Sequence, residues 1–278
     1  MPTPQVQQFA YGPISPIIAF ALSFIGAAFG LACVVRARSA PRRLRWRLLL
    51  VGAGALGGLG LWLMQLIAVQ GFDVPPLEIR FSLPMLALSL AVALAVMATA
   101  LLLAGPHRPS PWNVLIGGPL LGVGMVAVAY LAVAAIHLNA DIAYRPRPVA
   151  ASILIAVAGA TGLLWFSTYA QRAGSIALGA LVFAVAACAS HYSGMMALQV
   201  TPSHGVRPPT GVAIGDLVIP IVAVASLGLL SMLFVGLTMM SEEDSRPRSG
   251  AAPVEAARPL WPRGGEDLPV RIDRSGIR

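Results

Sequence analysis

Residues 190–195 read Ser-His-Tyr-Ser-Gly-Met, and they lie within one of seven long apolar stretches of this 278-residue chain. A histidine beside a tyrosine is costly in hydrocarbon, because no water is present there to hydrogen-bond the polar atoms. Polar residues that persist at such a depth either join helices together or form part of a site. The interpretation of His191 and Tyr192 therefore depends on the fold that surrounds them.

The composition is that of an integral membrane protein. Hydrophobic residues make up 57% of the chain and charged residues 11%, whereas soluble domains carry roughly 25% charged residues. Each apolar stretch is close to the ~20 residues that cross ~30 Å of hydrocarbon as a helix. The pattern predicts an all-α polytopic membrane domain over residues 1–240. Its seven transmembrane helices are expected at residues 13–36, 48–69, 83–103, 113–138, 149–170, 176–198 and 217–240.

The arginines predict the orientation of this domain. All 19 basic residues are arginines, and the absence of lysine excludes a retinal protein, which needs a lysine amine for its Schiff base. The positive-inside rule favours an external N-terminus and a cytoplasmic C-terminus, with 15 arginines inside and 4 outside. Residues 241–278, rich in Pro, Gly and Arg, are then a disordered cytoplasmic tail.

The hexapeptide at 190–195 has two degenerate counterparts in the chain. Met-Gln-Leu-Ile-Ala-Val at 64–69 ends the second apolar stretch, and Val-Ala-Tyr-Leu-Ala-Val at 128–133 lies late in the fourth. From Gln65 to Ala129 is 64 positions, and from Ala129 to His191 is 62. Each unit of this internal repeat is therefore a pair of helices. The predicted orientation places all three segments in the outer half of the membrane at comparable depth, where three helices can build one site.

These segments resemble the Met-His-Tyr-Thr motifs of the MHYT family of bacterial integral membrane sensors. The third segment matches the motif at His191, Tyr192, Gly194 and Met195, with serine in place of threonine. The resemblance covers about residues 13–240 and implies a multi-pass protein of the bacterial inner membrane. It also implies a bound metal, suggested to be copper, through which such proteins are proposed to sense oxygen, carbon monoxide or nitric oxide.

The chain departs from the family motif at two of the three histidine positions. Gln65 stands at the first of them and Ala129 at the second, so His191 is the one motif histidine that remains. Family members are often fused to cyclic-dinucleotide enzymes or histidine kinases, and neither output domain is found in this sequence. We therefore expect the chain to act through a separate cytoplasmic signalling protein.

The residues around His191 predict a copper site. His191 and Met195 are four positions apart and share one face of a helix, and Cys188 precedes His191 by three positions. Met64 on the second helix is positioned to add another sulfur. Imidazole, thioether and thiolate together suit Cu(I) better than zinc or magnesium. The expected metal ligands are thus His191, Met195, Met64 and Cys188.

Tyr130 and Tyr192 are the residues expected to contact a bound cofactor. The same side chains are also accounted for by packing, since tyrosines in membrane bundles donate hydrogen bonds to neighbouring helices and methionines fill space. The functions left open are a membrane signal sensor, a degenerate scaffold without ligand, and a small-solute or metal transporter. No enzyme and no nucleic-acid partner is predicted, because no phosphate-binding loop, nucleophile arrangement or paired carboxylates occur in the apolar stretches.

Overall fold

The computed structural model describes residues 12–75, 77–104, 111–170, 172–202 and 210–244. Seven helices in these ranges are long and apolar enough to span a membrane, which confirms the predicted helical membrane class. Six are single helices: α1 (Ile14–Ala37), α4 (Leu83–Ala104), α5 (Pro111–Ala134), α6 (Pro146–Tyr169), α7 (Ala173–Met195) and α8 (Ile214–Asp244). The remaining span comprises α2 (Arg42–Gly54), the π-helical η1 (Ala55–Leu63) and α3 (Met64–Gln70).

Six of the spans pack side by side in a closed ring. Helix α1 contacts α7, α7 contacts α6, α6 contacts α5, and α5 contacts α4. Helix α4 in turn contacts η1, which packs against α1 and completes the circuit. Helix α8 is the least buried span, and Leu217, Ile221 and Met232 on one of its faces join the buried hydrophobic cluster.

Glycines in η1 bring α1 and α4 into backbone contact with the second span. A Cβ added at Gly26 of α1 would lie 2.7 Å from the backbone nitrogen of Gly60. One added at Gly57 would lie 2.8 Å from the carbonyl oxygen of Ala93 in α4. Small residues permit such close approach, and the resulting van der Waals packing contributes to the association of helices in lipid.

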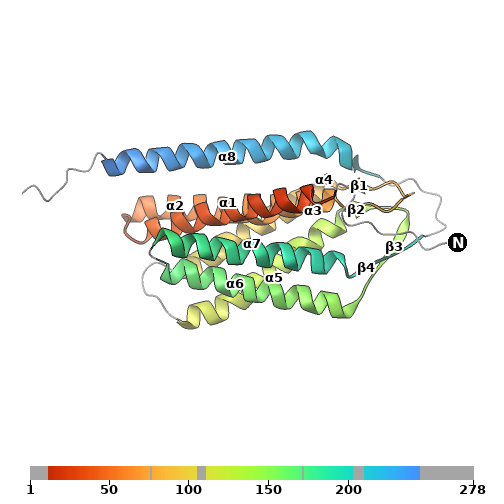
Figure 1. Ribbon diagram of the computed structural model, residues 1–278, viewed down its shortest axis with the longest axis horizontal. Coiled ribbons are helices and arrows are strands. Elements are labelled where there is room, and N and C mark those ends of the chain that lie inside the picture. Colours follow the sequence, from red (N-terminus) through yellow and green to blue (C-terminus); the bar gives the residue numbers. More distant parts are fainter. Residues whose placement is uncertain (1–11, 76, 105–110, 171, 203–209, 245–278) are drawn as a thin grey trace, which may run out of the picture. The chain divides into compact units, whose positions relative to one another are not determined.

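Short strands follow α3, α5 and α7 and form what we call the strand-capped end (Figure 1). Strand β1 (Arg80–Phe81) pairs with both β2 (Ile136–His137) and β5 (Val212–Ala213), in antiparallel register. Strand β3 (Ala140–Tyr144) pairs with β4 (Leu198–Pro202) over five residues, from Ala140↔Pro202 to Tyr144↔Leu198.

These strands correct two predicted helix ends. The helices expected at 113–138 and 176–198 end at Ala134 and Met195, because the residues that follow enter strands β2 and β4. The apolar Ile136 and Leu198 continue the predicted helices in sequence, but they belong to strands β2 and β4. Both join the buried hydrophobic cluster and are only 6% and 8% exposed.

The opposite end of the bundle carries the α1–α2 and α6–α7 connections, and we call it the arginine-rich end. Arg38 donates from Nη1 to the carbonyl of Ala170 at 2.7 Å and from Nη2 to the carbonyl of Ser167. A cation is favourable there because the helix dipole makes the C-terminus of α6 negative. Burial lowers the pKa of Arg38 from its ordinary value.

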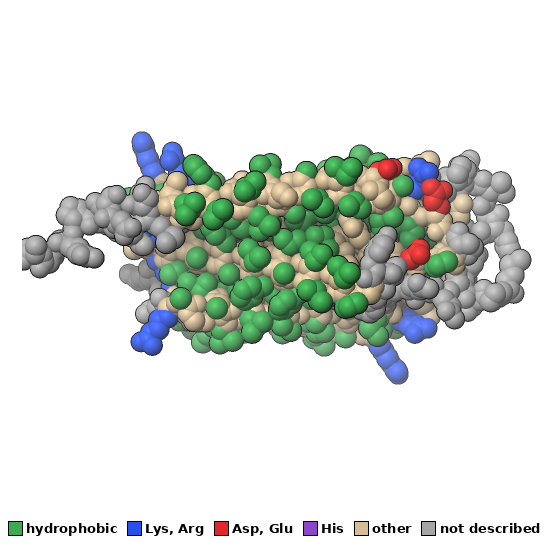
Figure 2. Space-filling view, turned by 45° about the horizontal axis from the view of Figure 1, so that its top comes forward, with side chains coloured by type: hydrophobic (Ala, Val, Ile, Leu, Met, Phe, Trp, Pro, Cys, Tyr) green, Lys and Arg blue, Asp and Glu red, His purple; other side chains and the backbone are tan. Residues whose placement is uncertain are grey.

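Charge and hydrophobicity divide the surface into bands. Apolar side chains cover the long middle of the molecule, and the described acidic side chains gather at the strand-capped end (Figure 2). Those acidic residues are Asp73, Glu78, Asp141 and Asp216. The broad apolar band is the surface expected of a multi-pass membrane protein, whose lipid-facing side chains have no need of polarity.

Two further boundaries differ from the predicted ones. The second span begins at Arg42 rather than at 48, because the arginine-rich segment 42–47 is itself helical. Helix α8 runs to Asp244, beyond the predicted end at 240. The chain divides by its internal contacts into residues 1–234 and 235–278, and of the second unit only the helical segment 235–244 is described. The rest of the predicted tail, 245–278, lies outside the described residues.

Candidate functional site

The three repeat segments lie at the same end of the bundle. Residues 64–69 form most of α3, residues 128–133 are the last turns of α5, and residues 190–195 are the last turns of α7. Each helix then leads toward the strand-capped end, through β1, β2 and β4 respectively. The repeat thus places equivalent residues of three helices near one another.

A cavity of about 20 Å³ lies among α5, α6 and α7 at this end. A water molecule needs a space of roughly 10–15 Å³ on this scale, so the cavity holds one small group. It is far smaller than a haem. Its lining residues are Val126, Ala129, Tyr130, Val133, Tyr144, Ser152, Ser190, His191, Gly194 and Met195.

Two polar side chains of this lining, His191 from α7 and Tyr130 from α5, have buried atoms without a protein partner. His191 is 5% exposed, and neither its Nε2 nor the hydroxyl of Tyr130 has a hydrogen-bond partner among the described residues. Leaving such a group unsatisfied costs about 1–3 kcal/mol, and native proteins rarely tolerate it. Both atoms are therefore available to bind a small polar molecule or a metal ion in the cavity.

Serines at the third repeat segment hold α7 against α6. Ser190 donates from Oγ to the carbonyl of Ser152 at 2.8 Å, and Ser193 donates to the carbonyl of Pro148 at 3.3 Å. These two bonds turn one face of α7 toward α6. His191, on a different face, is left to line the cavity with no hydrogen bond to its Nε2.

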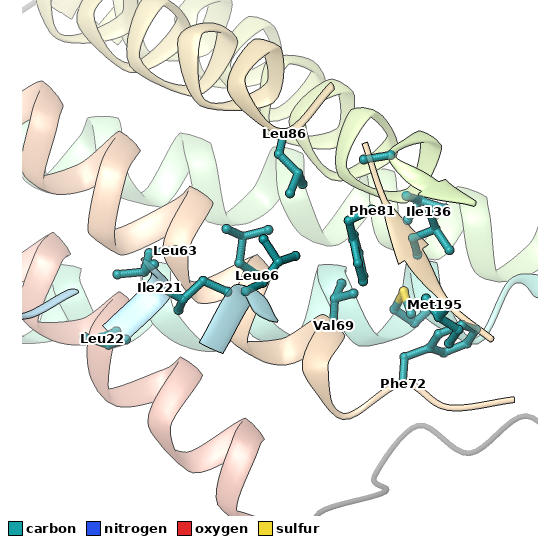
Figure 3. Packing of buried hydrophobic residues seen from close by; sticks show 14 of the residues in the cluster. Leu22, Leu63, Leu66, Val69, Phe72, Phe81, Leu86, Ile136, Met195 and Ile221 are labelled. Carbon is teal, nitrogen blue, oxygen red and sulfur yellow. The ribbon is translucent and has the colours of Figure 1, made fainter. Parts of the chain in front are cut away.

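Met195 takes part in both the cavity and the hydrophobic core. Its side chain lines the cavity and is 4% exposed. It also belongs to a buried cluster with Val69 and Phe72, and Figure 3 shows it beside both. The neighbouring Met196 is 62% exposed and lines no part of the cavity.

Three of the six predicted site residues lie elsewhere. Met64 is fully buried in α3 and is not among the cavity's lining residues. Tyr192 and Cys188 lie close together on the α1 side of α7, where the Tyr192 hydroxyl is near Ser15. The structure therefore places His191, Met195 and Tyr130 in the cavity lining. Met64, Cys188 and Tyr192 do not line the cavity, although the Tyr192 ring packs edge-on against the His191 ring with centroids 5.3 Å apart.

Tyr144 is a lining residue that the sequence did not single out. It ends β3, and its ring packs on that of Tyr130 with centroids 5.4 Å apart and planes inclined at 59°. Burial raises the pKa of Tyr144, and the nearby Tyr130 raises it further, so its phenol is neutral at physiological pH. Tyr144 has no counterpart in the repeat, and it falls in a loop whose course the periodicity does not predict.

The donor atoms of the cavity fit a small soft metal ion better than a hard one. His191 supplies an imidazole nitrogen, Met195 a thioether sulfur and Tyr130 a phenol oxygen. Imidazole and thioether together favour Cu(I). No group of three His, Cys, Asp or Glu residues in the described part of the chain is placed to hold a metal, so any metal in the cavity would depend on the His191 imidazole together with thioether and phenol donors.

Comparison with protein families identifies the repeat. The model of the MHYT domain, described as a bacterial signalling protein N-terminal repeat, matches residues 58–118 and 122–180. The two matches start 122 − 58 = 64 positions apart, the spacing from Gln65 to Ala129. The third segment, 190–195, lies outside both matches.

Three curated relatives share the membrane region. The chain is 34% identical over 158 residues to MucR of Pseudomonas aeruginosa, a bifunctional diguanylate cyclase/cyclic di-GMP phosphodiesterase, covering 54% of the chain and 22% of MucR. It is 28% identical over 209 residues to the cyclic di-GMP phosphodiesterase NbdA of the same species, covering 72% of the chain and 26% of NbdA. A signalling protein of Caulobacter vibrioides is 28% identical over 194 residues, covering 70% of the chain and 23% of that protein.

The chain spans about a quarter of the length of these relatives. No solved structure matches it. The MHYT domain is a membrane sensor domain and not a catalytic one, which agrees with a bundle of apolar helices. By its repeat, its seven spans and its relatives, the chain belongs to the MHYT family of multi-pass signalling proteins of the bacterial inner membrane.

Proposed function

We propose that this chain is the sensing part of a membrane signalling system and that its signal is a small ligand bound in the cavity among α5, α6 and α7. The observation that carries the proposal is the pair of unpartnered buried atoms, His191 Nε2 and the Tyr130 hydroxyl. They come from different units of the repeat and line the same cavity. In a membrane interior such atoms are strongly destabilising unless something binds them.

Copper is the occupant that this donor set suits best. His191 and Met195 would hold the ion, and Tyr130 would contribute its phenol from the facing helix. Copper held there would supply a metal centre able to bind a diatomic gas. The protein's own contribution would be to exclude water with the apolar side chains of Val126 and Val133 and to orient the donors from two helices.

A specific observation also favours the alternative of a scaffold that binds no metal. Two of the three motif histidines are replaced, by Gln65 and Ala129. The serines of the third segment form hydrogen bonds between helices, as packing residues do. Under this alternative a single water occupies the cavity, bridging His191 and Tyr130.

The signal would pass to a cytoplasmic signalling protein. The printed names of MucR and NbdA describe enzymes of cyclic di-GMP metabolism, which makes that chemistry the first candidate for the output. The positive-inside rule assigns the arginine-rich end to the cytoplasm and the cavity to the outer half of the membrane. Alkaline phosphatase fused after Ser39 should be inactive and the same enzyme fused after Thr210 should be active; the reverse pattern would contradict this orientation.

Copper titration of the purified protein tests the proposed function. The detergent-solubilised chain competes with a chromophoric chelator for Cu(I) under anaerobic conditions. We expect one copper per chain, with affinity reduced at least about tenfold in His191→Ala and also reduced in Met195→Leu. Met196→Leu is the matched control, because Met196 is the next residue but is 62% exposed.

Two results would separate the proposal from the scaffold alternative. Equal copper affinity in wild type, His191→Ala and Met195→Leu would exclude a site in the cavity. Equal losses in Met195→Leu and Met196→Leu would trace the effect to general perturbation of α7 rather than to the loss of a ligand.

A further inference from the structure

Tyr144 differs from every other residue that lines the cavity. The other nine belong to α5, α6 or α7, within the membrane-spanning helices, whereas Tyr144 belongs to β3. Tyr144 is 43% exposed, while the other lining residues are buried or half-buried. A side chain that touches both the cavity and the surroundings of the protein marks the cavity's entrance.

The ring of Tyr144 is held at this entrance by a side-chain and a backbone interaction. Its side chain packs on Tyr130, with ring centroids 5.4 Å apart. Its backbone is opposite Leu198 in the β3–β4 ladder, and the next residue, Arg145, donates its N–H to the carbonyl of Ala197 at 2.9 Å. Ala197 lies two residues after Met195, so the strand pair ties Tyr144 to the end of the helix that carries His191.

We infer that Tyr144 is the entrance residue of the cavity and that its ring controls the access of small molecules to His191 and Tyr130. This inference rests on the proposed function for the identity of the ligand, but not for the existence of the entrance. Rotation of the Tyr144 ring away from Tyr130 opens the path, and return of the ring closes it. Because β4 follows α7 directly, a shift of that helix end is transmitted to the entrance.

The contact between the Tyr144 and Tyr130 rings sets the scale of the free energy that favours the closed entrance over the open one. An aromatic pair contributes about 0.5–1.5 kcal/mol beyond burial. Its removal therefore raises the fraction of open entrance by about two- to tenfold. The ring and not the hydroxyl makes this contact, so phenylalanine at position 144 should retain closure and alanine should abolish it.

The experiment measures how fast a small neutral reagent reaches the cavity. Ala129 lines the cavity, and Ala129→Cys in a Cys188→Ser background places a thiol there. Methyl methanethiosulfonate is added to the detergent-solubilised protein, and labelling is followed by mass spectrometry of peptides. Native Cys33, 1% exposed in α1, is the internal reference for general loosening of the fold.

We expect Tyr144→Ala to raise the labelling rate at position 129 by about two- to tenfold, with the rate at Cys33 unchanged. Tyr144→Phe should label at the parent rate. Tyr169→Ala is the matched control, because Tyr169 is similarly exposed at 37% and packs on Trp165 at 4.5 Å, but lies at the opposite end of α6.

Equal labelling rates in the parent and Tyr144→Ala would overturn the inference, as would Tyr144→Phe accelerating labelling as much as alanine. Faster labelling of Cys33 in Tyr144→Ala would mean that this variant loosens the fold as a whole. The larger side chain of Tyr144→Trp then provides the test: slower labelling at position 129 supports the entrance, and an unchanged rate excludes it. No metal takes part in this readout. If the protein binds no copper but shows the expected labelling rates, the entrance is supported and the proposed copper site is excluded. If it binds copper in the cavity but Tyr144→Ala leaves the labelling rate unchanged, the copper site is supported and the entrance is excluded.

Discussion

Segments 64–69 and 190–195 occupy equivalent places in the repeat, yet the fold uses them differently. Met64 and Gln65 are 0% and 3% exposed, and His191 and Met195 are 5% and 4% exposed. Burial therefore does not distinguish the two. The surroundings do, because the third segment borders a cavity, whereas neither Met64 nor Gln65 lines it.

The difference arises from how the neighbouring helices meet. Segment 64–69 follows η1, whose Gly57 and Gly60 admit the backbones of α4 and α1. Segment 190–195 is joined to α6 through the hydroxyl groups of Ser190 and Ser193. A repeat thus sets the depth of a residue in the membrane, and the packing partners decide whether that residue faces a site.

The largest expected effect concerns the tightly packed region. Gly57→Ala should destabilise the fold by about 1–3 kcal/mol, because the added Cβ would lie 2.8 Å from the carbonyl oxygen of Ala93. The neighbouring Gly58→Ala is the control, since its Cβ would approach nothing closer than Leu94 at 4.0 Å. Thermal unfolding in detergent measures both. Equal stability of the two variants would contradict the account of backbone packing at η1.

A second prediction concerns the two repeat positions, 65 and 129, at which the motif histidine is missing. The repeat alone predicts that histidines restored at positions 65 and 129 would both strengthen copper binding. The structure predicts a gain at position 129 only, because Ala129 lines the cavity and Gln65 does not. Ala129→His should raise Cu(I) affinity by about tenfold, equivalent to ~1.4 kcal/mol, and Gln65→His should leave it unchanged. A gain from Gln65→His alone would place the ion nearer α3 than the cavity lies.

The smallest effect is expected at the contact between α6 and α7. Ser190→Ala removes the 2.8 Å hydrogen bond to Ser152 and should cost about 0.6 kcal/mol, the average for such bonds in a membrane protein. Ser193→Ala should cost less, because its bond to Pro148 is longer at 3.3 Å. Chemical or thermal unfolding in detergent gives both values. A loss of several kcal/mol in either variant would show that the serine does more than join the helices.

The sequence predicts the membrane class, the seven spans and the spacing of the repeat, because length and hydrophobicity suffice to define a helix in lipid. It does not predict the strands, since Ile136 and Leu198 continue the apolar stretches of the preceding helices although they belong to β2 and β4. The choice between His191 with Met195 and the other candidates, Met64 and Cys188, depends on which helices meet. That order of contact is a tertiary property, which no local pattern encodes.

An anomalous difference map at the copper edge, from crystals of the Cu(I)-loaded protein, would test the proposed copper site directly. We expect one peak in the cavity among α5, α6 and α7, within bonding distance of His191 and Met195. A peak beside Met64 or Cys188, or full copper loading with no peak at the cavity, would contradict it.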